Sequence, residues 1–453
     1  MSLRTGNSGR FMGLPRGTWI AAAGLALAFV VVGSVVVAGV GRSGDKAAAS
    51  PSADVGTVPA ARASASAVPT TASSPTPLPS PTIATGFTRA ASMTTGRSGH
   101  TATRLNDGRV LITDQSDGSA ELFDPATGTF AATGSMKVAR SGYSTTLLAD
   151  GTVLVAGGGG SGGGNSSGPG PALGSAEIYD PVTGTFAPAS PMTQPRTGHT
   201  ATLLADGSVL IAGGQRGQGA GSKATGSAEL YDPATGRFSA TGSMAGPRLH
   251  HTATLLTGGR VLIAGGDTSG GTVGDTSGVA AGDIVGGAAI ATAELYDPTT
   301  GKFVSAGTMK EPRAGHTATL LLDGRVLIAG GVVGGSGIVP TAELYAPDTG
   351  LFTVTGTMVS PRVGPAALLP DGRVLFTGGS GISVEATGAG VLGTAELFDP
   401  ATGKFTATSP MITARIGHTS TLLQDGRVLI AGGMEGMAPL AFAELYSEPK
   451  ATP

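Results

Sequence analysis

An Arg and a His stand three residues apart in segments that recur along the chain, such as RTGHTATLLADGSVLIAGG (196–214) and RAGHTATLLLDGRVLIAGG (313–331). Arg pairs well with carboxylates and phosphates, and His can carry protons or bind metal ions. The recurrence leaves two interpretations. Either a chemical site is repeated, or a structural unit is repeated.

The repeated His residues could form a ring around a central channel and bind a metal ion. Alternatively, each could begin an innermost strand and hydrogen-bond to the neighbouring repeat. Tyr143 and Pro365 replace His in two repeats, and a Pro weakens any symmetric metal ring. We therefore favour the structural interpretation for the five His residues at this position: His100, His199, His251, His316 and His418.

The repeated Arg residues are matched in number by repeated Glu residues. An acid or anion site is one interpretation, and a semi-buried Arg–Glu bridge, within each repeat or between neighbouring repeats, is the other. A guanidinium and a carboxylate can pair through two hydrogen bonds, which suits a bridge. We favour the bridge for the Arg set (97, 140, 196, 248, 313, 362, 415) and the Glu set (121, 177, 229, 294, 343, 396, 444).

His250 is the one His outside the repeated position, and it adjoins His251. We take His250, His251, Arg248 and Asp267 as candidate binding residues. Asp267, Asp275 and Asp283 lie in the segment GDTSGGTVGDTSGVAAGD (266–283), and oxygen-rich loops can hold Ca²⁺. The spacing matches no calcium loop, so a Gly-rich insertion is the favoured interpretation. We assign no catalytic residue, no metal ligand and no cofactor.

Strand-like segments must position these residues. The repeated Arg residues are 43 to 65 residues apart, which fits four-stranded blades rather than helical repeats. Each unit contains a run like HTATLL, a D-G or G-G turn, a run like RVLIAGG, and a run like AELYDP that ends in a D-P-x-T-G turn. A last run begins at Phe and ends at Met. The pattern predicts four antiparallel strands in each repeat.

The Phe and Met of the last run give the number of repeats. They stand six residues apart at seven places: 87/93, 130/136, 186/192, 238/244, 303/309, 352/358 and 405/411. The chain enters on a fourth strand (87–93) and stops after a third, at Tyr446. The lone first strand must therefore complete the last blade. The sequence predicts an all-β, seven-bladed β-propeller closed by its N-terminal strand, without open sheet edges.

These residues resemble the Kelch repeat, with paired glycines ending the second strand, an aromatic on the third and a large aromatic opening the fourth. The resemblance covers 86–447 and implies the Kelch β-propeller fold, which includes the central domain of galactose oxidase. Phe replaces the usual fourth-strand Trp, and the first repeat reads Thr113-Asp114 where the glycine pair is expected. Galactose oxidase-like copper chemistry needs a Cys cross-linked to a Tyr, and the sequence has no Cys.

Length variation is concentrated between the glycine pair and the AEL run. These loops should share one face with the links that lead into each innermost strand, and loop-built function is expected there. The loops consist largely of Gly, Ser, Ala, Thr and Val, with Phe442 as their aromatic residue. Sugar platforms and protein hot spots favour Trp, Tyr and Arg, so we expect neither strong carbohydrate stacking nor a high-affinity protein partner recognised by these loops alone.

The N-terminal part differs from the repeats. Residues 18–40 are uncharged and apolar, long enough to cross a bilayer, and Arg4, Arg10 and Arg16 precede them. We expect a cytoplasmic tail (1–17), a transmembrane signal-anchor (18–40), an Ala/Ser/Pro/Thr-rich linker (42–85), the propeller (86–447) and a C-terminal tail (448–453). The propeller should lie outside the cell membrane. The alternative is a cleaved signal peptide and a secreted propeller.

Composition limits the function further. The net charge of −2 does not point to nucleic acid, and the absence of Cys excludes disulfides and thiolate metal sites. We expect a monomeric, membrane-tethered binding module for a protein or cell-surface ligand. The alternative is a glycan-directed or oxidative enzyme that uses the mouth of the channel.

Overall fold

A computed structural model describes residues 86–160, 170–217, 222–268, 288–334, 337–382 and 389–448. These ranges contain β-strands and turns and no α-helix. No helix within these described residues is long and apolar enough to cross a bilayer. The predicted tail, anchor and linker (1–17, 18–40 and 42–85) lie outside the described residues.

Turn residues divide each repeat into strands, as the third repeat illustrates. Its strands are β12 (Thr200–Leu203), β13 (Val209–Ala212), β16 (Ser227–Asp232) and β17 (Arg237–Ser243). Between β12 and β13, Gly207 has φ +86° and the carboxylate of Asp206 accepts the Ser208 N–H at 2.9 Å. A D-P-x-T-G turn joins β16 to β17. Short turn signals therefore fix the antiparallel register.

The same arrangement recurs as seven four-stranded antiparallel sheets in the described residues. We number them by their innermost strand along the chain. Sheet 1 consists of β2 (Thr101–Arg104), β3 (Val110–Thr113), β4 (Ala120–Asp124) and β5 (Thr129–Ala132). Sheet 2 consists of β7 (Ser144–Leu147), β8 (Val153–Ala156), β10 (Ala176–Asp180) and β11 (Thr185–Ala189). Sheet 3 is described above.

Sheet 4 consists of β18 (Thr252–Leu255), β19 (Val261–Ala264), β20 (Thr292–Asp297) and β21 (Lys302–Thr308). Sheet 5 consists of β22 (Thr317–Leu320), β23 (Val326–Ala329), β26 (Thr341–Ala346) and β27 (Leu351–Thr357). Sheet 6 is β29 (Ala366–Leu368), β30 (Val374–Thr377), β33 (Ala395–Asp399), β34 (Lys404–Ala407). Sheet 7 is β35 (Thr419–Leu422), β36 (Val428–Ala431), β39 (Phe442–Ser447) and β1 (Gly86–Ser92).

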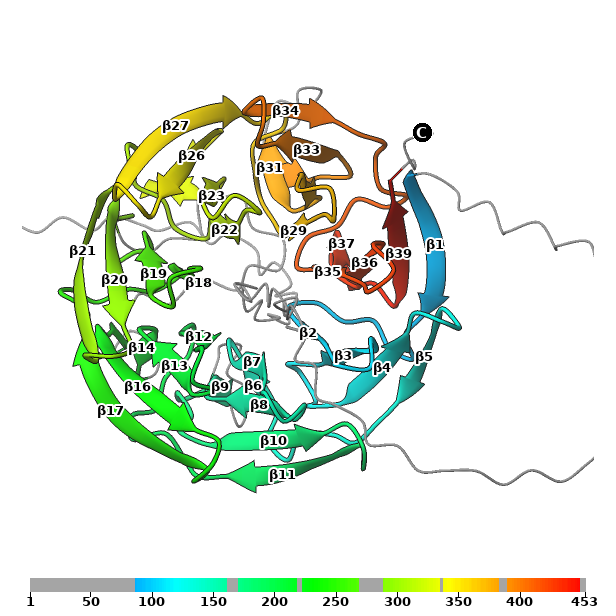
Figure 1. Cartoon of the computed structure of the whole chain (residues 1–453). Coiled ribbons are helices and arrows are strands. Elements are labelled where there is room, and N and C mark those ends of the chain that lie inside the picture. Colours follow the sequence, from blue (N-terminus) through cyan, green and yellow to red (C-terminus); the bar gives the residue numbers. More distant parts are fainter. Residues whose placement is uncertain are drawn as a thin grey trace, which may run out of the picture.

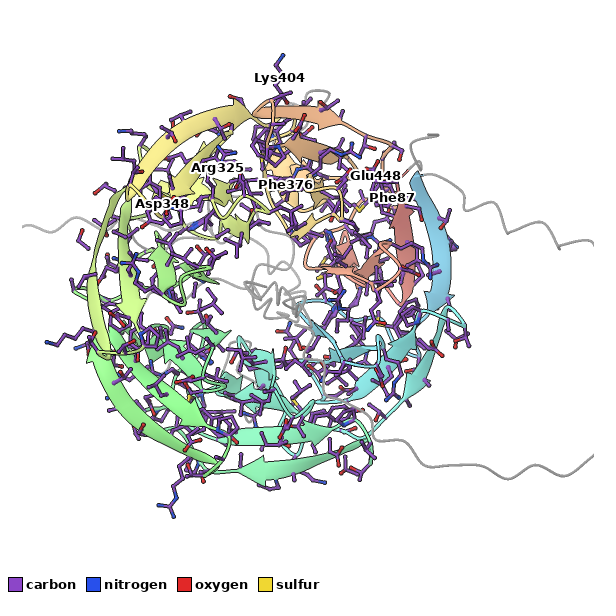
Figure 2. The ribbon with its side chains drawn as sticks, viewed as in Figure 1. Phe87, Arg325, Asp348, Phe376, Lys404 and Glu448 are labelled. Atoms are coloured by element: carbon purple, nitrogen blue, oxygen red, sulfur yellow. The ribbon has the colours of Figure 1, made fainter. Side chains whose placement is uncertain are left out.

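The sheets stand around a common centre, each with its first strand innermost and its last strand on the outer circumference (Figure 1). In sheet 7 the outermost strand is β1, which pairs with β39 from Gly86 opposite Ser447 onward. The two ends of the propeller sequence therefore meet in one sheet. Phe87 and Glu448 lie close together at this junction (Figure 2).

Shorter strands form small separate sheets at one face of the ring. They are β6 (Arg140–Ser141) with β9 (Gly159–Gly160), β14 (Gln215–Arg216) with β15 (Lys223–Ala224), β24 (Val332–Val333) with β25 (Gly337–Ile338), β37 (Met434–Glu435) with β38 (Ala438–Pro439), and β28 (Arg362–Val363) with β31 (Ser380–Ile382) and β32 (Ala389–Val391). They pair residues after the glycine pair with each other or with the link into the same sheet. The second-to-third-strand loops and the links thus share a face, as expected. We call it the loop face.

Apolar residues fill the space between neighbouring sheets rather than one central core. One cluster combines Leu154 and Ala156 of sheet 2 with Ile211 and Tyr231 of sheet 3. The second strand of every sheet is completely buried. The third- and fourth-strand aromatics contact each other, as in Tyr231–Phe238 with ring centroids 4.8 Å apart. Each sheet is therefore stabilised by both of its neighbours.

Candidate functional site

Every repeated Arg forms an ion pair with the Glu of the same repeat. The Arg lies on the link that enters the sheet, and the Glu lies on the third strand. In six pairs Nη2 and Oε1 are 2.6–3.0 Å apart, and no side chain in these pairs is more than 6% exposed. Arg415 and Glu444 form the seventh pair. The expected bridges are confirmed.

Both partners also bind backbone groups, as the third repeat shows. Arg196 Nη1 donates to the carbonyl oxygens of Gly213 and Ser227, each at 2.9 Å. Glu229 accepts the Thr193 N–H at 2.7 Å. Burial lowers the pKa of Arg196, while Glu229 opposes that shift. Because these groups bind one another and hold the link to the sheet, they are not available to react with a substrate.

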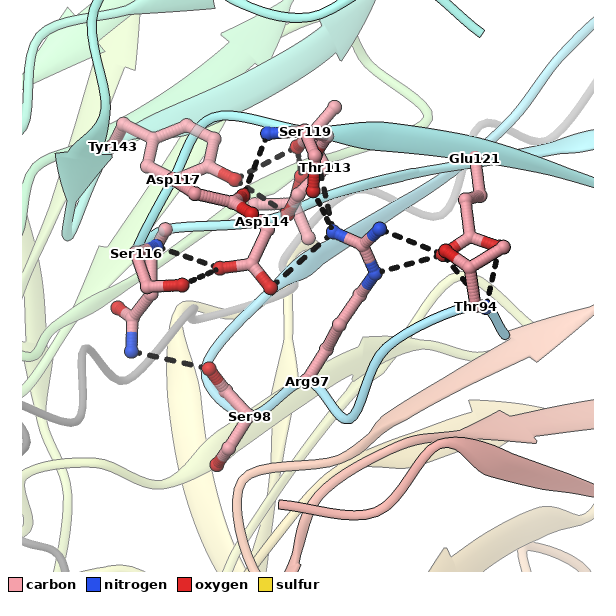
Figure 3. Close-up of polar contacts among 12 residues, drawn as sticks. Thr94, Arg97, Ser98, Thr113, Asp114, Ser116, Asp117, Ser119, Glu121 and Tyr143 are labelled. Carbon is pink, nitrogen blue, oxygen red and sulfur yellow. Dashed lines mark hydrogen bonds and ion pairs between the residues drawn. The ribbon is translucent and has the colours of Figure 1, made fainter. Parts of the chain in front are cut away.

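The first repeat uses a second carboxylate in this network (Figure 3). Arg97 contacts Glu121 at 2.7 Å and Asp114 at 3.2 Å. Strand pairing places Thr113 opposite Thr101, as Ala212 lies opposite Thr200. The glycine-pair positions are therefore Asp114 and Gln115, which corrects the expected Thr113-Asp114 by one residue. Asp114 gives Arg97 a carboxylate partner where the other repeats offer a glycine carbonyl.

The five repeated His residues hydrogen-bond to the preceding sheet. In each, Nε2 meets a hydroxyl group at 2.9–3.1 Å: His100–Thr419, His199–Ser144, His251–Thr200, His316–Thr252 and His418–Thr377. Burial, and then the nearby Arg, lower the pKa of His100, His199 and His316 to about 3. These residues are neutral sheet-to-sheet contacts, and the structural interpretation is confirmed for all five.

The two replacements behave differently. Tyr143 keeps a sheet-to-sheet contact, because its hydroxyl donates to the Thr113 carbonyl at 2.7 Å. Burial raises its pKa to about 12. Pro365 has no side-chain donor and no N–H, so sheet 6 lacks this contact to sheet 5.

His250 takes a place that glycine holds in the other repeats. In the R-x-G-H motif the third residue is Gly with φ near +60° in five repeats, at positions 99, 142, 198, 315 and 417. His250 has φ +53° and is the one described non-glycine residue with positive φ. A side chain in this conformation is strained, which directs attention to function.

The side chain of His250 meets Asp267. Nδ1 lies 2.8 Å from Asp267 Oδ2, and backbone hydrogen bonds between Leu249 and Asp267 hold the link and the loop together. Asp267 is 1% exposed, whereas 10% of the His250 side chain reaches the surface. The carbonyl of His250 accepts the Gly315 N–H of the next link. The pair therefore belongs to the links on the loop face.

The four predicted binding residues separate into two groups. Arg248 binds Glu294, Gly265 and Thr292, and His251 binds Thr200, so both are structural. His250 and Asp267 form the non-repeated pair. The sequence signal that identifies His250 is its alignment with the glycine position of the motif. Nothing in the sequence showed that its partner would be Asp267, 17 residues away across a hairpin.

The pair can do specific chemistry. An ionised carboxylate only accepts hydrogen bonds, so Asp267 holds the proton on Nδ1 and fixes the orientation of the ring. Nε2 can then accept a hydrogen bond when the imidazole is neutral, or donate one when it is protonated. Elsewhere in the described structure, no three His, Asp or Glu side chains gather into a group that could hold a metal ion.

Comparisons with known proteins show the fold. No family model matches the sequence, and no curated protein does. A solved structure titled as a novel fungal alcohol oxidase of the AA5 family in complex with copper is similar at a TM-score of 0.57 and 18% identity, covering 80% of this chain and 76% of its own. The structure of YjhT matches at a TM-score of 0.50 and 15% identity, covering 68% of this chain and 95% of its own. Together with the all-β architecture, these likenesses support a β-propeller fold.

Proposed function

We propose that the chain is a seven-bladed, Kelch-type propeller tethered outside a membrane that binds a protein or cell-surface ligand on its loop face. Each four-stranded sheet is one blade in this proposal, residues 18–40 are the anchor and 42–85 the linker. The bound contact is made by Nε2 of His250. The observation that carries the proposal is the difference between the repeated ionisable residues and the His250–Asp267 pair.

The repeated residues hold the ring together, and their side chains are buried in mutual contacts. His250 and Asp267 depart from the repeat, and this departure has a cost, because glycine would occupy the position without strain. A strained residue whose oriented side chain is 10% exposed is expected where a ligand is recognised. A long Gly-rich insertion follows Asp267 in the sequence.

The test compares ligand binding by the full chain and by two variants. We expect the chain to bind a glycan on an array, or an extracellular protein in a pull-down, and His250→Gly to lose that binding. The glycine restores the repeat's own residue, so the fold is kept. Asp232→Asn, which changes a turn on the opposite face, serves as the control and should bind normally. Equal binding by His250→Gly would place the ligand elsewhere, and an array without signal would remove glycans.

An enzyme at the channel mouth is the second candidate. A carboxylate that orients an imidazole is the arrangement of a general base, and the fungal neighbour is an alcohol oxidase. In this case the wild type would turn over glycan substrates, or alcohol substrates when an electron acceptor such as dioxygen is supplied, and His250→Asn would abolish turnover while binding persists. The absence of turnover in the wild type with both substrate classes would leave the binding module.

A further inference from the structure

Neighbouring sheets are joined by contacts at several distances from the centre, and the two innermost of these contacts are weakest between sheets 5 and 6. We call this junction the 5/6 seam. At the innermost level, each of the other sheets shares a hydrogen bond with a His or Tyr of the next sheet. At the seam that residue is Pro365, and the facing Thr317 hydroxyl turns to the Ala329 carbonyl of its own sheet at 3.3 Å.

The second contact involves the glycine pair. The N–H of its second glycine donates to the carbonyl of the next repeat's Arg. Five junctions have this bond at 2.8–2.9 Å, from Gly158, Gly214, Gly266, Gly379 and Gly433. At the seam the bond from Gly331 to Arg362 measures 3.4 Å. A bond of this length contributes less than a normal one.

The third contact lies on the face opposite the loops. An Arg of the first hairpin reaches the turn after the third strand of the next sheet. The bond is 3.2 Å from Arg109 to Pro181 and 2.9 Å from Arg427 to Pro125. At the seam, Arg325 and Pro400 are 3.4 Å apart. Sheets 2 and 3 have Thr152 and Ser208 in place of the Arg, so this contact does not by itself distinguish the seam.

The outer contact pairs a fourth-strand Thr with a Tyr hydroxyl of the next sheet where both residues are present. Thr133–Tyr179 and Thr241–Tyr296 are both 2.9 Å apart. At the seam the aromatic residue is Phe398, so Thr355 meets no Tyr hydroxyl and donates to the Gly403 carbonyl at 3.5 Å. The junction of sheets 7 and 1 also has a Phe, Phe123, at this position.

Apolar packing remains at the seam, as it does at the other junctions. Leu327 of sheet 5 shares a buried cluster with Phe376 and Phe398 of sheet 6. On the loop face, Val332 and Val363 meet across the seam in a smaller cluster. Hydrogen bonds fix direction and register, whereas apolar contacts are non-directional and tolerate sliding.

We propose that the 5/6 seam is the place where the ring opens. The inference rests on the fold alone and not on the proposed ligand site. Strands β28, β31 and β32 form a separate sheet that begins in the link to sheet 6, so it moves with that sheet. Opening therefore separates the loops of sheet 6 from those of sheet 5 and widens the loop face at one defined position.

Hydrogen exchange of the full chain tests the seam. Peptides that cover β22 and β29 should exchange about tenfold faster than those that cover β12 and β18, because two normal hydrogen bonds are missing or stretched. Equal protection at the two junctions would overturn the proposal. So would faster opening at any other junction.

Two variants restore contacts and should slow exchange at the seam. Phe398→Tyr adds one hydroxyl at a position that Tyr holds in five other sheets, and Pro365→His restores the innermost donor. If Pro365→His does not fold, Phe398→Tyr decides. As the matched opposite, His316→Ala removes the innermost contact between sheets 4 and 5 and should accelerate exchange there. A stable Phe398→Tyr without slower exchange at β27 and β33 would contradict the seam.

Discussion

At the scale of single residues, the ionisable groups of the repeat are attachment points. Each Arg–Glu pair fastens a link to the sheet that follows, and each repeated His fastens a sheet to the one before. Both are buried, so both depend on keeping their partners. Removing one member of a buried ion pair is costly because the other charge remains without compensation.

Glu229→Gln should therefore lower the free energy of unfolding by about 3–5 kcal/mol, because Arg196 loses its buried counter-charge. Urea denaturation measures the loss. Asp107→Asn removes a partner from the exposed Arg109 pair and should change stability by about 0–1 kcal/mol. The assignment of Glu229 would be wrong if both variants lost the same amount.

The buried His residues make stability depend on pH. Their folded pKa values, about 3 for His199, lie below the usual 6.5, so the unfolded chain takes up protons first as the pH falls. Stability should be complete above pH 6.5 and decline toward pH 3, by about 1.4 kcal/mol per pH unit for each His. Urea midpoints at pH 7.5, 6 and 5 measure this decline. His199→Gln should show a shallower decline, and an unchanged midpoint at pH 5 would contradict the neutral state.

At the scale of elements, the glycine pair is a junction between sheets. A Cβ on Gly213 would lie 2.6 Å from Cε1 of His251 and 2.8 Å from the Arg248 carbonyl oxygen of sheet 4's link. The sequence predicted a strand end at this position. The structure adds that the pair is glycine because the next sheet approaches so closely.

Gly213→Ala should destabilise the protein by well over the roughly 1–2 kcal/mol that positive φ alone costs. Gly236→Ala is a matched control, because Gly236 has nearly the same φ of +65° but nothing within 4 Å of its Cβ position. Thermal unfolding of the two variants separates crowding from strain. Equal losses would mean that the contact with sheet 4 does not matter.

Much of each element was predictable because turn chemistry is local. Asp206-Gly207 and the D-P-x-T-G motif predicted the strand ends. The lone fourth strand at the start of the pattern and the missing fourth strand at its end predicted the closing strand. Contacts between sheets were less accessible. The hairpin Arg109 gave no sign of its reach to Pro181, and Asp267 was assigned to an insertion although it is buried against His250, because both contacts depend on how segments distant in sequence pack.

At the scale of the whole molecule, β1 completes the ring. It covers the edge of β39, and Phe87 packs on Tyr446 with ring centroids 4.9 Å apart. Without it, the unpaired edge of β39 would be available to other chains.

A chain that starts at residue 94 should therefore melt roughly 10 °C lower and aggregate with increasing concentration. Calorimetry and light scattering measure both effects. A chain that starts at residue 86 keeps β1 and should match the full chain, which also tests the predicted boundary of the propeller. Equal melting of the two shortened chains would show that closure contributes nothing.

The pairing of Gly86 with Ser447 has a consequence for protein engineering. Because the start of β1 and the end of β39 lie side by side, a short peptide could join them into a continuous circle. New ends could then be cut in another hairpin, such as the Asp206-Gly207 turn, and each such circular permutant would keep the same ring with a different order of synthesis. The residue at which the ring begins is therefore set by the order of the coding sequence and not by the fold.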